Sequence, residues 1–75
     1  MKTHELDATG LLCPLPVLKL RKRLAGLAPG EQIAVRADDP AAIIDVPHFC
    51  AEAGHTLVET REEEDAQVYL VRKGN

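Results

Sequence analysis

Cys13 is the residue in this sequence whose surroundings most favour chemistry, because it stands before two prolines at an expected helix start. Prolines such as Pro14 and Pro16 suit a first helical turn, where their missing N–H would be unpaired anyway. A helix N-terminus carries about half a positive charge, and thiols at such sites have pKa values lowered to roughly 3.5–7.5. We expect Cys13 to cap the helix as a thiolate, facing the amides of Leu15 and Val17.

The alternative for Cys13 is an inert role as a small hydrophobic residue, which is how most cysteines behave. Spacing alone leaves both interpretations open. The three histidines, His4, His48 and His55, lie elsewhere in the sequence, and no motif places one beside Cys13. A hydrolase with a Cys-His pair is therefore not indicated. The chemistry that remains for an exposed thiol is sulfur transfer with a substrate presented by another protein.

Cys50 is the second thiol, and its neighbours Phe49 and Ala51 favour a packing role. A redox pair of Cys13 with Cys50 is the alternative, and it needs Cα atoms within about 7 Å. The histidines and cysteines match no strong zinc spacing, so we expect no metal. Nothing in the sequence indicates another cofactor.

The helix after Cys13 has one apolar stripe and a mixed opposite side. Apolar residues recur at spacings of three and four, as expected for a buried helical face, at Val17, Leu20, Leu24 and Leu27. Two leucines and two lysines lie on the opposite side, near the thiol: Leu15, Leu18, Lys19 and Lys22. Leu12, the residue just before Cys13, is grouped with them. This set favours a protein-docking surface, although singly exposed leucines are also ordinary.

The elements that position these residues follow from the alternation of apolar and polar side chains. Alternating runs predict strands at 3–8, 32–37, 55–60 and 67–72. Gly10 ends the first run, and the first helix is expected at roughly 14–27. The Asp38-Asp39-Pro40 segment predicts a helix start capped by a carboxylate. Because Pro47 interrupts the chain soon after that start, we expect one turn near 41–45 and then a helix at about 47–53. The acidic segment 61–66 is expected to be a hairpin loop.

The predicted fold is α+β, a two-layer sandwich in the order β-α-β-α-β-β. Two helices would cover one face of a four-stranded mixed sheet and leave the other face partly open. With 75 residues, the chain is expected to form one domain over residues 1–75.

Composition narrows the classes of function. The net charge of −3 and an aromatic content of 3% argue against direct nucleic-acid binding. Two cysteines are too few for a disulfide scaffold. No apolar run approaches the ~20 residues that span a bilayer, and residues 1–5 lack the apolar core of a signal peptide. We therefore expect a cytoplasmic protein with reduced thiols and no membrane contact.

The sequence resembles the TusA/SirA-like sulfur carrier family, and the TusA branch in particular. The family signature is a Leu-Asp-x-x-Gly-Leu lead followed by Cys-Pro-x-Pro, which matches Leu6-Asp7-Ala8-Thr9-Gly10-Leu11-Leu12-Cys13-Pro14-Leu15-Pro16. The similarity continues at Pro29-Gly30-Glu31, Ala37-Asp38-Asp39-Pro40-Ala41, Asp45-Val46-Pro47-x-Phe49-Cys50 and Tyr69-Leu70-Val71-Arg72-Lys73-Gly74.

The resemblance implies a cytoplasmic sulfur relay. The motif cysteine, here Cys13, would accept sulfane sulfur as a persulfide from a cysteine desulfurase or rhodanese and pass it to an acceptor protein. Family destinations include 2-thiouridine in tRNA, sulfur oxidation and the molybdenum cofactor. Arg21 and Asp39 are further candidates for contact with these partners. The resemblance does not decide whether the chain is itself an enzyme, and a relay protein is expected to be monomeric when free.

One departure from the family concerns Leu12, since many TusA members have arginine before the cysteine. Two alternatives to the sulfur carrier stay open at this point. One is a thiol–disulfide or redox-sensing protein that uses both cysteines. The other is a non-catalytic interaction module in which Cys13 has no chemical role.

Overall fold

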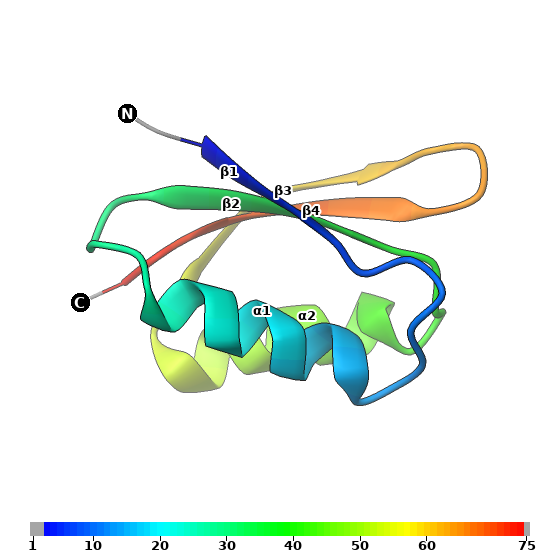
Figure 1. The fold of residues 1–75 in the computed structure, drawn as a ribbon, viewed down its shortest axis with the longest axis horizontal. Coiled ribbons are helices and arrows are strands. Elements are labelled where there is room, and N and C mark those ends of the chain that lie inside the picture. The colour runs from blue at the N-terminus through cyan, green and yellow to red at the C-terminus, as the bar shows by residue number, and fades with distance from the viewer. Residues whose placement is uncertain (1–2, 75) are drawn as a thin grey trace.

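Four strands form one mixed sheet, and two helices cover one of its faces (Figure 1). The computed structural model describes residues 3–74, so the first two residues of the N-terminal segment 1–5 lie outside it. The elements in chain order are β1 (Thr3–Asp7), α1 (Leu15–Ala25), β2 (Gln32–Ala37), α2 (Ala42–Ala53), β3 (Thr56–Glu62) and β4 (Gln67–Arg72). The predicted α+β two-layer fold is confirmed.

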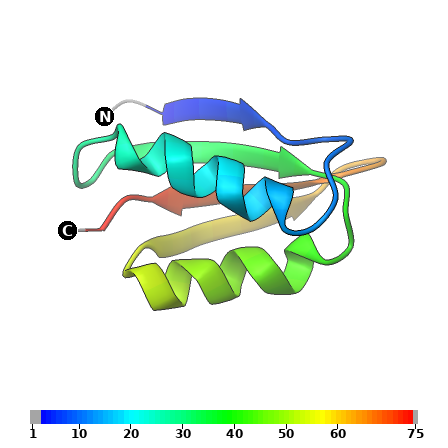
Figure 2. The ribbon, with the colours of Figure 1, turned by 60° about the horizontal axis from the view of Figure 1, so that its bottom comes forward.

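The sheet order β1-β2-β4-β3 places the only parallel pair of this sheet, β1 and β2, at one side. Leu6 pairs with Val35 in the parallel pair, and Val35 pairs with Tyr69 in the antiparallel pair of β2 and β4. Because β1 and β2 run in the same direction, the helices that follow them begin at the same end of the sheet. Figure 2 shows the two connecting loops, before α1 and before α2, close together at that end.

The core lies between the sheet and the two helices. Alternate residues of β2, namely Ile33, Val35 and Ala37, are fully buried, as expected for a strand with one covered face. The helices contribute stripes of buried residues at spacings of four, which are Leu20 and Leu24 from α1 and Ala42, Val46 and Cys50 from α2. These stripes fix which side of each helix remains open to partners.

The second helix corrects one prediction, because α2 runs without a break from Ala42 to Ala53 through Pro47. Pro47 cannot donate a backbone hydrogen bond, and a proline inside a helix costs about 3 kcal/mol. The buried residues Ala42, Val46 and Cys50 lie on both sides of it at a spacing of four. Burying one large apolar side chain contributes about 1.5–3 kcal/mol, so packing of a single continuous stripe outweighs the local defect.

Other boundaries also differ from the predicted ones: β1 ends at Asp7 rather than at 8, and β3 begins at Thr56 rather than at 55. Helix α1 ends at Ala25 rather than near 27, because the next two amides, of Gly26 and Leu27, bond three residues back to Arg23 and Leu24. Strand β3 extends to Glu62, which pairs with Gln67. The acidic loop therefore covers 63–66 instead of 61–66. Within residues 3–74, neither helix has the length and apolar character needed to cross a membrane.

Candidate functional site

Cys13 lies in the turn that leads into α1 and not at the helix cap. Pro14 is the cap residue, it follows a cis peptide bond, and the helix begins at Leu15. The amide of Leu15 donates to the carbonyl of Leu12 at 2.8 Å. The expected cap position of Cys13 is therefore wrong, since the turn from Leu12 uses the first helical amide and moves the helix start past the cysteine.

Two aspartates of the loop between β2 and α2 hold the Cys13 loop in place. The Asp38 carboxylate accepts from the amide of Gly10 at 3.0 and 3.1 Å, and Gly10 has a φ of 79° that favours glycine. Asp39 accepts from the amide of Cys13 at 2.6 Å and from the amide of Ala41 at 3.1 Å. The cap residue of α2 is Ala41, without a side-chain cap. The carboxylate cap expected at the start of α2 is therefore not formed, and the Asp38 and Asp39 side chains instead link the loop before α2 to the loop before α1.

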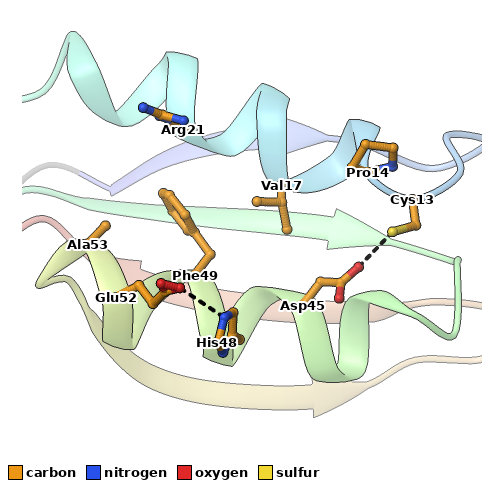
Figure 3. A pocket seen from close by; sticks show the side chains of 9 residues that line it. All are labelled: Cys13, Pro14, Val17, Arg21, Asp45, His48, Phe49, Glu52 and Ala53. Carbon is orange, nitrogen blue, oxygen red and sulfur yellow. Dashed lines mark hydrogen bonds and ion pairs between the residues drawn. The ribbon is translucent and has the colours of Figure 1, made fainter.

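The Cys13 thiol donates a hydrogen bond to Oδ2 of Asp45, with a sulfur–oxygen distance of 2.9 Å (Figure 3). This bond, then desolvation, then the negative charges of Asp45 and Asp39 raise the pKa of Cys13 above its ordinary value. The expected lowering of the pKa is contradicted. The hydrogen bond to Asp45, desolvation and the two carboxylate charges together outweigh the half charge of a helix end that begins two residues later.

A cleft of about 490 Å³ opens beside the thiol between α1 and α2. Figure 3 shows side chains from both helices along it. Its lining consists of Cys13, Pro14, Val17, Arg21, Asp45, His48, Phe49, Glu52 and Ala53. Nε2 of His48 lies 3.0 Å from the Glu52 carboxylate. Arg21, expected to contact partners, and His48, which the sequence did not link to Cys13, therefore share the cleft with the thiol.

Cys50 lies in a different environment on the same helix as Asp45. Its side chain is buried, with 2% exposed, whereas Cys13 is exposed, and both thiols are free. Burial raises the pKa of Cys50 from 9.0 to about 11. Cys50 follows Asp45 by five positions, so it lies about 7.5 Å further along the helix axis and faces a direction turned by roughly 140°. The predicted packing role of Cys50 agrees with this position, and a pair with Cys13 is not favoured.

The residues expected to contact partners do not lie on one surface. Leu15, Leu18, Lys19 and Lys22 line a shallow groove with Leu11. Leu12, the residue before Cys13 that was grouped with these leucines, is 71% exposed. Arg21 lines the cleft on the other side of α1, and the Asp39 carboxylate accepts from the amide of Cys13. Pro16 is buried and so supports the fold of the helix start.

Two exposed apolar residues in the first turn of α2, Ile43 and Ile44, were not predicted from the sequence. Neither was the role of Asp45 as the acceptor for the Cys13 thiol. Their position near Cys13 could have been predicted, because two β-α units with parallel strands place both helix starts at the same end of the sheet. Of the other histidines, His4 pairs with Glu31, and Nδ1 of His55 accepts from the amide of Gly74. Among residues 3–74, no cluster of three or more His, Cys, Asp or Glu residues fits a metal ion.

The chain is similar to known proteins in both sequence and fold. Residues 4–73 match the family model described as Sulfurtransferase TusA. The fold is similar to the crystal structure of a SirA-like protein from Desulfitobacterium hafniense, with a TM-score of 0.84 and 24% sequence identity. That match covers 99% of this chain and 100% of the other chain. The structural likeness supports the fold, and the family model supports the family.

Proposed function

Since the chain belongs to the sulfurtransferase TusA family, we propose that Cys13 carries sulfur between two proteins. Cys13 accepts sulfane sulfur as a persulfide from a cysteine desulfurase or a rhodanese. It then passes the sulfur to an acceptor protein, for 2-thiouridine formation in tRNA or another sulfur-trafficking route. In this proposal residues 1–75 act as one sulfur carrier domain in the cytoplasm, without a cofactor and without direct contact to nucleic acid.

The observation that carries the proposal is the exposure of a free thiol on a loop held by long-range hydrogen bonds. The amide of Cys13 is bonded to Asp39, and the amide of Gly10 is bonded to Asp38. A partner can therefore reach the sulfur without any opening of the core. Exposed leucines on one side and a cleft on the other give this partner apolar surface next to the thiol.

The transfer step needs no oxidant. Cys13 loses its proton, and its sulfur forms a bond to the terminal sulfur of the donor persulfide. The sulfur–sulfur bond of the donor breaks, and the donor cysteine leaves as a thiolate that takes up a proton. The sulfane sulfur keeps its oxidation state, and the same exchange in the reverse sense delivers it to the acceptor.

The redox alternative is less well supported, since its second thiol, Cys50, is buried in the core. The proposal is tested by incubating the chain with a cysteine desulfurase and cysteine, or with a rhodanese and thiosulfate, followed by intact mass spectrometry. The expected gain is the mass of one sulfur atom, lost again on treatment with a reductant. Cys13→Ser should gain nothing.

Cys50→Ala is the matched control, and it should load as fully as the wild-type chain. The absence of an adduct on folded wild-type protein with several desulfurases and rhodaneses would overturn the proposal. So would equal loading of Cys13→Ser, because that would place the sulfur elsewhere.

A further inference from the structure

Resting on the proposed function, we propose that Asp45 is a positioning residue for sulfur transfer. Its carboxylate holds the thiol of the unloaded Cys13 in the protonated form and turns the sulfur toward the cleft between α1 and α2. This role is distinct from that of Cys13, since Asp45 neither attacks the donor persulfide nor carries the sulfur.

The geometry of the contact requires a proton between the two groups. Oδ2 of Asp45 lies 2.9 Å from Sγ of Cys13, at a site that joins the start of α2 to the loop before α1. An ionised carboxylate can only accept a hydrogen bond. A thiolate can only accept as well, so the contact exists while the sulfur keeps its hydrogen. Ionisation of Cys13 exchanges this attraction for repulsion between two anions.

The other charged groups around the thiol do not replace this contact. Asp39, in the loop before α2, adds a second negative charge while its oxygens accept from backbone amides. On α2, His48 pairs with Glu52. From α1, Arg21 lines the cleft as a positive charge. The raised pKa of Cys13, with the bond to Asp45 as its largest cause, agrees with this arrangement.

The arrangement has opposite effects on the two states of the carrier. Before loading, the bond suppresses thiolate formation and so slows reaction with any electrophile that reaches the loop. After loading, the terminal sulfur of the persulfide ionises more easily than a thiol. The anion then faces two carboxylates, Asp45 and Asp39, and their negative charges favour a position turned away from them.

The test is the rate of alkylation of Cys13 by iodoacetamide from pH 6 to 10, measured by mass spectrometry of the Cys13 peptide. Asp45→Asn keeps the shape of the side chain and removes its charge. We expect its rate near pH 7 to rise about threefold or more, because loss of the anionic partner favours the thiolate. Asp45→Glu keeps the negative charge and should be alkylated as slowly as the wild type.

Glu52→Gln is the control, because Glu52 lines the same cleft and is paired with His48. It should leave the alkylation profile of Cys13 within about 1.5-fold of wild type. An unchanged profile for folded Asp45→Asn would overturn the inference. If that variant does not fold, the wild-type profile decides, since a midpoint below the ordinary thiol value of 9.0 would overturn it equally.

Failure of this inference is separate from failure of the proposed function. Alkylation reports the ionisation of Cys13 and needs no sulfur donor. Persulfide formation on wild-type protein reports the carrier function and needs no change at Asp45.

Discussion

The two cysteines occupy contrasting regions, one in the loop before α1 and one in the middle of α2. Both thiols have a raised pKa, but the causes differ. At Cys13 the first cause is a hydrogen bond to a carboxylate at an exposed site, whereas at Cys50 it is burial among apolar side chains. A raised pKa is therefore compatible with a role in chemistry at one position and in packing at the other. Accessibility, and not acidity, separates the two thiols.

The largest expected difference is in native-state alkylation at pH 8.5. Cys13 should react about 100-fold faster than Cys50, because Cys50 must wait for an opening of the core that costs a few kcal/mol. Peptide mapping after a short exposure to iodoacetamide measures both rates in one sample. Comparable rates in the folded protein would break the contrast, whereas comparable rates in denaturant are expected.

The second effect is a loss of stability in alkali that originates at Cys50. Its folded-state pKa is about 11 against an ordinary value of 9.0. A raised pKa contributes stability that is complete below pH 9 and declines as pH rises toward 11. We expect a decline on the order of 1–2 kcal/mol over that range, measured by urea unfolding. Cys50→Ala, compared with its own stability at pH 7, should show a smaller decline.

The third effect concerns replacement of each sulfur by oxygen. Cys50→Ser places a hydroxyl in the core and should cost about 1–2 kcal/mol of unfolding free energy. Cys13→Ser lies at an exposed site and should change stability by less than about 0.5 kcal/mol. Urea unfolding at pH 7 compares the two variants, and an equal cost at both positions would contradict the assignment of Cys50 to packing.

The smallest expected effect is a change in the alkylation rate of Cys13 when a positive charge is added next to it. Leu12→Arg adds a positive charge at an exposed position beside the thiol, where pairs of charges contribute about 0.2–1 kcal/mol. We expect Cys13 to be alkylated about two- to threefold faster at pH 7, less than the gain for Asp45→Asn. Lys22→Leu is a useful comparison, since Lys22 lies in the groove away from the cleft. A slower rate for Leu12→Arg would contradict the electrostatic account.

Local patterns predicted the elements of the fold and the exposure of the helix side next to Cys13. Alternation located the strands, and spacings of three and four located the buried side of α1. The interruption expected at Pro47 was wrong because the local rule omits the packing of Val46 and Cys50 on both sides of the proline. Tertiary packing outweighed the local preference there.

The electrostatics of the site were not predictable from the Cys-Pro motif, because the deciding groups are distant in sequence. Asp45 lies 32 residues from Cys13, and Asp39 lies 26 residues from it. Groups adjacent to Cys13 in the chain predict a lowered pKa, and this direction is wrong because Asp45 and Asp39 raise the pKa from another loop. The parallel pairing of β1 with β2 brings the starts of α1 and α2 to the same end of the sheet, and the Cys-Pro motif contains no information on this pairing.

The Cys-Pro motif alone would not reproduce this site in another protein, because aspartates of a second loop hold the Cys13 loop in place. A synthetic peptide of residues 9–20 would keep the cysteine and both prolines but lose every acceptor that Asp38, Asp39 and Asp45 supply. Grafting the motif onto another scaffold would require a second loop with carboxylates at matching positions. The reactive site therefore consists of two chain segments, and it forms only when the β1-α1 and β2-α2 units have packed together.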